Sequence, residues 1–461
     1  MRRDHRWCVC CARQLKPNVI EIRRKANAPA SNPTRTLRRI PDTYSKDNPL
    51  VIDLETLYRR TLENCRPEEA VRQALAGDGP PGMAAPHPRT VVAIGKCAGG
   101  LLDGVPSFDD AFVVIPHGYP PPRDTRRAPH VFRGGHPIPD EGSFDAGHRM
   151  LDFVRDHDDI LFLISGGGSA CVEAPLEPWF TRQDLIEAGR RIVAAGIPID
   201  QMNVVRKHLS AIKGGRLGLL VRGRPVTMLY SDVATGDRSS VASGPTLSDS
   251  STKAQAIAIL ERVGGCQSII EKLRDEDLPE TVRQIERASA AIIADNSTMV
   301  RAAARLAADA GHRPVVLEDQ IESDVEAAAE LLARKASELS EGEVLVAGGE
   351  PTVVAHGAGK GGRCLEVAVR FALVERRHSW RRDEGRTAAA PLLALFGSSD
   401  GVDGNSGVAG AIVDRGVSDP APLEDALSRS DSLSAIGLIG RPIIIPPTGN
   451  NLRDLYLVAR T

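Results

Sequence analysis

Short apolar runs alternate with longer stretches of helical periodicity over most of this chain. The apolar runs cover residues 90–94, 112–115, 160–164, 226–230 and 290–294, and polar or glycine-rich residues follow them. Short runs of this kind are typical of strands that are buried on both faces of a parallel sheet. Apolar residues at helical spacing predict helices over 144–157 and 184–195, with Ser143 as the cap of the first. The alternation of strand, loop and helix predicts a doubly wound α/β sheet.

The same pattern predicts a second α/β unit toward the C-terminus. Strands are expected at 314–317, 343–347 and 392–396, and helices at 299–311 and 323–339. Two more helices are expected within 50–75, separated at Pro67, because proline disrupts a helix interior. We therefore expect a Rossmann-like N-terminal domain over 49–285 and a smaller α/β C-terminal region over 286–461. The active site is expected in the cleft between them.

The first 48 residues differ in composition from the rest. Residues 1–40 carry nine arginines and two lysines against two acids, with scattered prolines and no clear amphipathic period. This composition predicts a disordered basic arm over residues 1–48. Three alternatives stay open: an over-early start codon, an organelle transit signal, and a zinc site at Cys8, Cys10 and Cys11. The zinc alternative is weak, because these cysteines lack the usual two-residue gap and a second ligand pair.

Composition also excludes several classes of protein. The net charge of −2 arises from 58 basic and 60 acidic side chains, so no overall basic field is present for nucleic acid or an anionic membrane. No apolar stretch has the length that a bilayer crossing requires. The eight cysteines are scattered, apart from three near the N-terminus, which favours a reducing cytoplasm over a disulfide framework. The expected partner is therefore a small molecule.

Two of the predicted strands end in loops that are suited to an anion. The strand at 160–164 leads into Ser165, Gly166, Gly167, Gly168 and Ser169. Glycine permits positive φ and a close approach of the backbone to a ligand. The strand at 90–94 leads into Gly95 and Lys96, and only ten of the 58 basic residues are lysines. An ammonium group meets a phosphate as a point charge. A turn without a ligand and a solvated lysine are the plain alternatives.

A basic segment, a turn histidine and an aspartate add further candidates. Arg206, Lys207 and Lys213 lie close together in the sequence. On one continuous helix, Arg206 and Lys213 would share a face and present two cations to a polyanionic ligand, unless the helix is an ordinary basic surface helix. Asp232 follows a predicted strand, where it suits a metal, a hydroxyl group or a helix cap. His136 is either a ligand contact or a turn residue.

The C-terminal region supplies candidates at its own strand ends. Asn296 and Glu350 each follow a predicted strand. Arg363 follows a segment with four glycines in six residues, which suits a bidentate grip on a carboxylate or phosphate. Asp400 and Asp403 follow the strand at 392–396 and are candidate Mg²⁺ ligands or a general base. A structural cap or turn is the alternative for each aspartate.

These motifs together resemble the glycerate 2-kinase family, whose C-terminal part is called the MOFRL domain. The motifs are Ser-Gly-Gly-Gly-Ser-Ala from 165, Val-Arg-Lys-His-Leu-Ser from 205, Lys-Gly-Gly-Arg-Leu from 213, Ser-Asp-Val from 231, Ala-Ser-Gly-Pro-Thr from 242, Gly-Gly-Glu-Pro-Thr-Val from 348, Gly-Lys-Gly-Gly-Arg-Cys-Leu-Glu from 359, Ser-Asp-Gly-Val-Asp-Gly from 399 and Pro-Thr-Gly-Asn-Asn-Leu-Arg-Asp-Leu from 447. They stand in the order that the family has. The resemblance covers about Pro49 to the C-terminus and places the MOFRL domain at about 343–456.

The resemblance implies phosphoryl transfer from ATP to the 2-hydroxyl of D-glycerate, giving 2-phosphoglycerate and ADP, with Mg²⁺. It implies that Lys96 and Arg363 lie beside the transferring phosphoryl group, because these residue types match the family's proposed catalytic pair. Asp400 is then a metal ligand or base, and the Ser165–Ser169 loop holds an anion without being a Walker A loop. The expected partners are ATP and a small hydroxy acid. The oligomeric state stays open, with a homodimer as one option.

Four positions depart from the family pattern. Cys364 stands where Asn is usual, and Arg238 where a second acid commonly follows an aspartate. Ser399 replaces a common Thr, and Asn450 stands where a small residue or Thr is expected. These departures leave two alternatives open, a kinase for another hydroxy or sugar acid and a non-catalytic ligand-binding homologue. Reduction of hydroxypyruvate, a label some family members have carried, would need a dinucleotide fingerprint that Gly166–Gly168 does not satisfy.

Overall fold

The structure is a computed structural model that describes residues 37–39, 53–78, 89–124, 128–233, 238–382 and 392–460. Most of the predicted basic arm lies outside these ranges. Its described part, β1 (Leu37–Arg39), pairs antiparallel with β8 (Arg313–Leu317), so disorder is the wrong prediction for these three residues. Within the described ranges, no helix combines the length and the apolar run that crossing a membrane requires.

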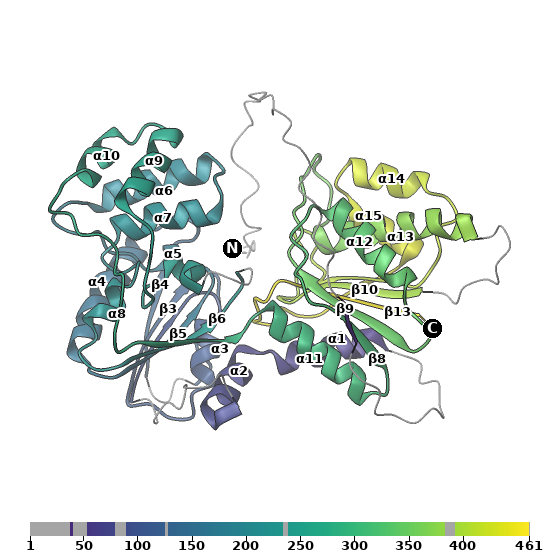
Figure 1. Cartoon of the computed structure of the whole chain (residues 1–461), viewed down its shortest axis with the longest axis horizontal. Coiled ribbons are helices and arrows are strands. Elements are labelled where there is room, and N and C mark those ends of the chain that lie inside the picture. Colours follow the sequence, from purple (N-terminus) through teal and green to yellow (C-terminus); the bar gives the residue numbers. More distant parts are fainter. Residues whose placement is uncertain are drawn as a thin grey trace, which may run out of the picture.

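The chain forms two sheets, one in each lobe of the molecule (Figure 1). The first has six parallel strands in the order β4-β3-β2-β5-β6-β7. They are β2 (Thr90–Ile94), β3 (Asp110–Pro116), β4 (His130–Gly134), β5 (Ile160–Ser165), β6 (Pro225–Tyr230) and β7 (Ser289–Ala294). This is the Rossmann strand order, which reverses between the central strands β2 and β5. The predicted Rossmann-like sheet is confirmed.

Two strands of this sheet differ from expectation. β4 was not predicted, because it is an edge strand whose side chains are mostly exposed and therefore shows no apolar run. β7 was assigned to the C-terminal region by the boundary at 285, but it pairs in parallel with β6. Backbone pairing across the strand at 289–294 therefore places the end of the first sheet beyond that boundary.

The first lobe has helices that cover its sheet and helices of a further layer. They are α2 (Pro67–Gln73), α3 (Ala98–Asp103), α4 (Glu141–Asp156), α5 (Gly168–Cys171), α6 (Arg182–Ala194), α7 (Ile199–Leu209), α8 (Arg216–Leu220), α9 (Lys253–Val263) and α10 (Gln267–Leu273), with the short helical turns η1 (Ala74–Asp78) and η2 (Arg238–Ser243). α4 begins earlier than predicted. Asp140 is its cap and accepts the Ser143 N–H at 3.0 Å, while Ser143 lies inside the first turn and completes a capping box.

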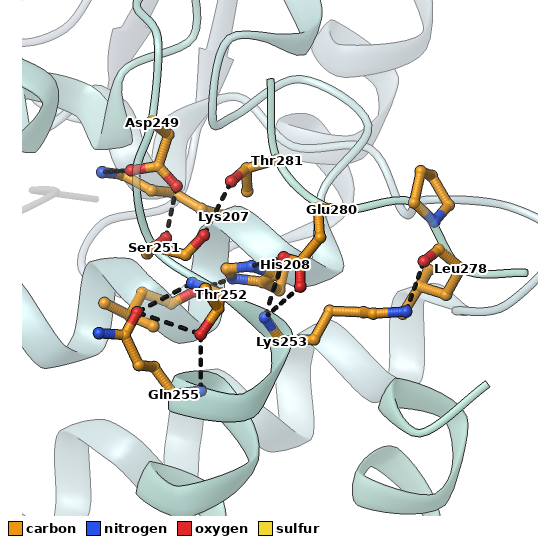
Figure 2. Close-up of polar contacts among 12 residues, drawn as sticks. Lys207, His208, Asp249, Ser251, Thr252, Lys253, Gln255, Leu278, Glu280 and Thr281 are labelled. Atoms are coloured by element: carbon orange, nitrogen blue, oxygen red, sulfur yellow. Dashed lines mark hydrogen bonds and ion pairs between the residues drawn. The ribbon is translucent and has the colours of Figure 1, made fainter. Parts of the chain in front are cut away.

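Helices α6, α7, α9 and α10 form a separate helical layer with its own apolar core (Figure 1). A cluster of polar side chains holds α7 in place within this layer (Figure 2). Lys207 Nζ lies 2.8 Å from Asp249 Oδ1, and both side chains are 4% exposed. The next residue, His208, contacts Glu280 Oε2 at 3.1 Å, and Glu280 also accepts the Lys253 N–H at the start of α9. Two successive residues of α7 are thus held by different loops.

The second sheet has seven strands in the order β1-β8-β9-β13-β10-β11-β12. Only β8 and β9 pair in parallel, and every other neighbouring pair is antiparallel. The remaining strands are β9 (Glu343–Gly349), β10 (Leu392–Ser398), β11 (Gly410–Val413), β12 (Gly440–Ile443) and β13 (Asp454–Arg460). The predicted α/β class holds, while β11 to β13 were not predicted.

Alternate residues of β9 face two different helical layers. Val344 and Val346 pack in one core with α1 (Leu54–Asn64) and α11 (Asn296–Asp309). Leu345 and Ala347 pack in the other with helices of the opposite face. That face is covered by α12 (Val325–Ser337), α13 (Arg363–Arg382), α14 (Ala421–Ser428) and α15 (Ser432–Ile439). The period of two is that of a strand buried on both faces.

The first helix belongs to the second sheet, contrary to the predicted domain boundary. The hydroxyl of Tyr58 in α1 donates to the Ser398 carbonyl at 2.5 Å, and Tyr58 is fully buried. Arg59 donates to the Ile444 carbonyl at 3.2 Å. The apolar face of α1 therefore covers β9, β10 and β13, although the helix precedes the whole first sheet in sequence.

Candidate active site

The loops after β2 and β5 contact each other where the strand order reverses. The Lys96 N–H donates to the Gly166 carbonyl at 2.9 Å, and the Cys97 N–H donates to Ser165 Oγ at 3.0 Å. Ser165 Oγ donates in turn to the Ile94 carbonyl at 3.2 Å. Because Ser165 is fully buried, its hydroxyl holds the two loops together and does not face a ligand. Ligands bind at such reversals in open α/β sheets.

Glycines let the loop after β5 approach two charged side chains. Gly167 has a φ of +82°, and a Cβ there would lie 2.8 Å from Lys96 Cγ. A Cβ at Gly166 would collide with the carboxylate of Asp232. The loop therefore lies against Lys96 and Asp232, which follow β2 and β6. Gly168 begins α5 and packs against Ala242.

Lys96 differs from the other lysines that the structure describes. Lysines 207, 213, 253, 272 and 335 are at least partly buried, and each has an oxygen partner. Lys96 is also partly buried, but among the described residues its Nζ has only the Tyr119 ring, 5.9 Å from the ring centre. Burial lowers the pKa of Lys96, and the electrostatic effects of Tyr119, Asp232, Cys97 and Asp400 outweigh it, so the pKa lies above its ordinary value. The ammonium group remains charged and available.

Ser169 has a buried hydroxyl partner on another loop. Ser243 Oγ lies 2.9 Å from Ser169 Oγ and 2.8 Å from Asn203 Oδ1 of α7. Ser243 has a φ of +59°, and Ala242 before it has a φ of +50°. Such values are costly for residues other than glycine. The Gly214 N–H donates to the Ser243 carbonyl at 3.1 Å, so the strained turn is held by its neighbour in space.

The three basic residues of the 203–217 segment separate in the structure. α7 ends at Leu209, so the predicted shared helical face of Arg206 and Lys213 is wrong. The Ser210–Gly215 turn that follows sends Lys213 inward, where its Nζ lies 2.5 Å from Glu173 Oε2 at 1% exposure. Lys207 is buried against Asp249. Only Arg206 retains an open position, with Nη2 donating to the Pro137 carbonyl at 3.3 Å.

The two lobes meet where β6 and β7 of the first sheet approach the segment before β13. Asn451 Nδ2 donates to Asp232 Oδ2 at 2.7 Å, and Arg453 Nε donates to the Asp232 carbonyl at 2.7 Å. Asn296, at the start of α11, is buried and donates to the Leu452 and Asp454 carbonyls. Asn296 therefore joins the lobes rather than facing open space. Residues 234–237, which complete the predicted Asp232 loop, lie outside the described ranges.

Arg363 is held by two carboxylates. It donates from Nε to Asp454 Oδ2 at 2.8 Å, and its Nη1 lies 2.9 Å from Glu350 Oε1. Glu350 also lies 3.2 Å from Arg453 Nε. Burial lowers the pKa of Arg363, and the two acids raise it well above its ordinary value. Burial raises the pKa of Glu350. Arg363 is thus fixed in place by its ion pairs, with 31% of its side chain exposed.

Backbone N–H groups of the glycine-rich segment before Arg363 donate hydrogen bonds to other parts of the protein. The Lys360 N–H donates to Asp431 Oδ1 at 3.0 Å, and the Gly361 N–H donates to Asn405 Oδ1 at 2.8 Å. The Gly359 N–H donates to the Arg429 carbonyl at 3.3 Å. This segment positions the start of α13, and three of its backbone amides are already used.

Asp400 and Asp403 have different surroundings. Both oxygens of Asp403 accept backbone N–H groups at the start of α13, from Cys364 at 3.1 Å and from Leu365 at 2.8 Å. Asp403 is 1% exposed, and burial raises its pKa to about 7. It therefore caps α13, which is the structural alternative for this residue, and its role as a metal ligand stays a prediction.

Asp400 remains open. Its Oδ1 accepts the Ser398 hydroxyl and the Val402 N–H, both at 2.9 Å, while Oδ2 has no hydrogen-bond partner among the described residues. The side chain is solvent-exposed, but surrounding protein raises its pKa above the ordinary value. Within the described ranges, no group of three or more His, Cys, Asp or Glu residues could enclose a metal.

Three of the four residues that depart from the family pattern are buried. Cys364 is completely buried in α13. Ser399 Oγ accepts the Leu452 N–H at 2.8 Å, and Asn450 Nδ2 donates to the Leu62 carbonyl at 2.9 Å. Arg238 is exposed and donates to the Ala290 carbonyl. Cys364, Ser399 and Asn450 therefore support the surrounding structure from buried positions, whereas Arg238 lies at the surface.

Sequence reasoning did not single out Asn451, Arg453 or Asp454, although their motif was recognised. Arg453, with a φ of +68°, also donates from Nη1 to Gln320 at 2.8 Å. A signal was present, since a run with two asparagines, an arginine and an aspartate before an apolar strand is unusual. Ser243 likewise lies in one of the family motifs, Ala-Ser-Gly-Pro-Thr from 242, and was not singled out.

The arrangement is that of a two-lobed α/β enzyme site. A glycine loop and a lysine without an ion pair in the described part of the chain follow the central strands of one sheet, and carboxylates follow strands of the other. Such a site is suited to bind and neutralise a small anion.

Comparison with known proteins gives the family. Residues 53–276 match the family described as "Domain of unknown function (DUF4147)", and residues 343–454 match the MOFRL family. A glycerate 2-kinase of Sulfurisphaera tokodaii is 34% identical over 72% of this chain and 79% of its own length. A D-glycerate 2-kinase of Thermotoga maritima is 32% identical over 71% and 79%. A Thermotoga maritima crystal structure of glycerate kinase has a TM-score of 0.76 at 27% identity, covering 88% of this chain and 98% of that one.

This chain belongs to the glycerate 2-kinase family. The family resemblance inferred from the motifs is thereby confirmed. An Agrobacterium vitis relative, 32% identical over 80% of this chain and 86% of its own, is named provisionally as a hydroxypyruvate reductase.

Proposed function

We propose that this protein transfers the γ-phosphoryl group of ATP to the 2-hydroxyl of D-glycerate, giving 2-phosphoglycerate and ADP. The observation that carries the proposal is Lys96, a charged side chain without a carboxylate partner among the described residues, lying against the glycine loop at the strand-order reversal. The names of the relatives support the same reaction. Phosphoryl transfer needs positioning and charge neutralisation, and this is what such a lysine supplies.

Lys96 and Arg363 would act from opposite lobes. The ammonium of Lys96 meets the transferring phosphoryl group, and the loop of Gly166 to Ser169 shapes the space beside it. Arg363, already fixed by Asp454 and Glu350, presents its exposed edge toward the same group. Preorganised charge of this kind lowers the barrier because it does not reorganise during the reaction.

One carboxylate of the site, that of Asp400, is suited to hold Mg²⁺. It usually takes one or two protein carboxylates and completes its shell with water and phosphate oxygens, so a three-carboxylate enclosure is not required. Asp400 fits, because it is an exposed residue whose Oδ2 has no partner among the described residues, whereas Asp403 caps α13. When bound, the ion would neutralise charge on the phosphates. Asp400 alternatively accepts the proton of the acceptor hydroxyl, a role that its raised pKa suits.

ADP release with Mg-ATP tests the function. The acceptor panel is D-glycerate, L-glycerate, tartronate and hydroxypyruvate, and Lys96→Ala is the variant. We expect release with D-glycerate that falls at least 100-fold in the variant, in line with the loss of one charge at a phosphoryl group. Release with another acid alone would reassign the acceptor. ATP binding without release from any acceptor would favour the non-catalytic alternative.

NADH oxidation with hydroxypyruvate is measured in parallel. We expect none, because the loop after β5 lacks the spacing of a dinucleotide fingerprint. A cytoplasmic location and a homodimer stay predictions from the sequence.

A further inference from the structure

Three basic side chains of the first lobe lie near one another, between the central strand β2, the edge strand β4 and α7. Lys96 follows β2, His136 follows β4, and Arg206 lies on α7. Arg206 donates to the carbonyl of Pro137, the residue next to His136. Burial, together with the nearby charges of Lys96 and Arg206, lowers the pKa of His136 to about 4.

Among the described residues the cluster forms no ion pair with a carboxylate, although Glu173 lies near Arg206 and Asp232 and Asp400 act on Lys96. Lys96 and Arg206 form no ion pair there, and His136 is exposed without a hydrogen-bond partner. Across the junction the opposite holds, since Arg363 and Arg453 each pair with two carboxylates. Gathering like charges without a counter-ion is unfavourable, and a bound anion would remove that cost.

A cavity lies beside the cluster. Arg206, Ser169 and Pro139 line it with apolar residues of α6 and α7, and Glu173, the one acid of the lining, is already paired with Lys213. Ser169 belongs to the loop that lies against Lys96. The cavity therefore brings the glycine loop and Arg206 to one enclosed space, which suits a small acid better than a nucleotide.

We propose that Arg206 and His136 bind the carboxylate of the acceptor hydroxy acid. This assignment rests on the proposed function and specifies the orientation of the acceptor within it. Lys96 is electrostatically coupled to His136 on one side and to Asp400 on the other. The acceptor's carboxylate then lies toward β4, and its 2-hydroxyl lies near Lys96 and Asp400. An arginine fork suits a planar carboxylate, and an imidazole N–H donates to its second oxygen.

The direct test is the titration of His136 by nuclear magnetic resonance with added D-glycerate. A neighbouring carboxylate favours the imidazolium, so D-glycerate should raise the pKa of His136 by about one unit or more. Glycerol, a neutral molecule of similar size, should leave it unchanged. The titration is run with and without a non-hydrolysable ATP analogue, and with the analogue alone. An unchanged pKa in every glycerate experiment overturns the proposal, as does a shift caused by the nucleotide analogue but not by D-glycerate.

Arg206→Gln gives the second readout. We expect D-glycerate to bind about 10- to 100-fold more weakly, which corresponds to the loss of one charged hydrogen bond, while kcat changes less than KM. Arg149→Gln is the matched control, because Arg149 contacts Asp145 on the exposed surface of α4. Melting temperatures show whether Arg206→Gln remains folded, and His136→Phe repeats the affinity test without changing α7. Equal D-glycerate affinity in both glutamine variants overturns the proposal.

The two proposals fail differently. A His136 shift with D-glycerate, without any ADP release, would retain the carboxylate subsite and remove the kinase function. ADP release with unchanged KM in Arg206→Gln and His136→Phe would retain the kinase and remove the subsite.

Discussion

The guanidinium of Arg363 donates two hydrogen bonds to the carboxylate of Asp454, from Nε at 2.8 Å and from Nη2 at 3.2 Å. Asp454 is completely buried, and the Tyr456 hydroxyl donates to the same carboxylate at 3.1 Å. The pair joins the first residue of α13 to the first residue of β13. The catalytic candidate of the second lobe is therefore oriented by the protein before any ligand binds.

Asp454→Asn should lower both stability and turnover. Loss of one partner from a buried ion pair costs about 3–5 kcal/mol, and Arg363 would lose its fixed orientation. Urea unfolding and ADP release measure the two effects. Asp425→Asn is the control, because its pair with Arg429 is exposed and should contribute less than about 1 kcal/mol. Equal stability of the two variants would contradict the prediction.

Asp400→Asn and Asp403→Asn should separate the two aspartates by their dependence on Mg²⁺. If Asp400 holds the ion, its variant needs at least about tenfold more Mg²⁺ for half-maximal ADP release, because a carboxylate ligand is lost. Asp403→Asn should leave this concentration unchanged and lower stability by about 1 kcal/mol, as expected for a helix cap. A raised Mg²⁺ requirement in Asp403→Asn would restore it as a ligand.

Ser243→Gly and Ser243→Ala should differ in stability although both lose the hydroxyl. Glycine relieves the strain of a φ of +59°, which costs other residues about 1–2 kcal/mol, while alanine retains it. The glycine variant should therefore melt at the higher temperature. Both should reduce ADP release, because Ser169 loses its hydrogen-bond partner. A more stable alanine variant would mean that the strain is compensated elsewhere.

Asp249→Asn should destabilise the protein in a pH-dependent way. Burial raises the pKa of Asp249, but hydrogen bonds from Lys207 and Ser251 outweigh it, so the pKa lies below its ordinary value. The folded state thus holds the proton less tightly than the unfolded state. The stabilisation is present above about pH 4 and is lost as the pH falls through the lower folded-state pKa.

Urea unfolding at several pH values measures this effect. The difference between the parent and Asp249→Asn should be about 3–5 kcal/mol at pH 7 and should shrink below pH 4. Glu261→Gln is the control, since its pair with Arg274 is about half exposed. A difference that stays constant with pH would show that packing, not the charge of Asp249, holds α7.

The sequence predicted the first sheet well because its central strands are buried on both faces. β2 matches the predicted 90–94, and β5 and β6 extend the predicted runs by one residue each. β4 was not predicted, because an exposed edge strand carries polar residues and shows no apolar run. The helix α13 was not predicted, because its start was interpreted as a glycine loop that leads to a ligand-binding arginine.

The site was predicted in part. Local patterns singled out Lys96, Arg363 and Asp400 as candidates because they follow strands or glycines, and their roles stay predictions. The patterns could not show that Lys213 and Asp403 are buried by Glu173 and by α13, because those partners lie about 40 residues away in sequence. His136 gave no signal beyond its turn, because its neighbours Lys96 and Arg206 come from other elements.

The packing of α1 has a consequence for biosynthesis. Tyr58 and the carbonyl that it contacts are 340 residues apart, so the helix leaves the ribosome long before its binding surface exists. At about 5–20 residues per second, the delay is roughly 20–70 seconds. Leu54, Leu57 and Leu62 must remain uncovered or be shielded by another molecule during this interval. The first sheet can form as the chain emerges, but α1 is covered only after the last strands of the second sheet have been synthesised.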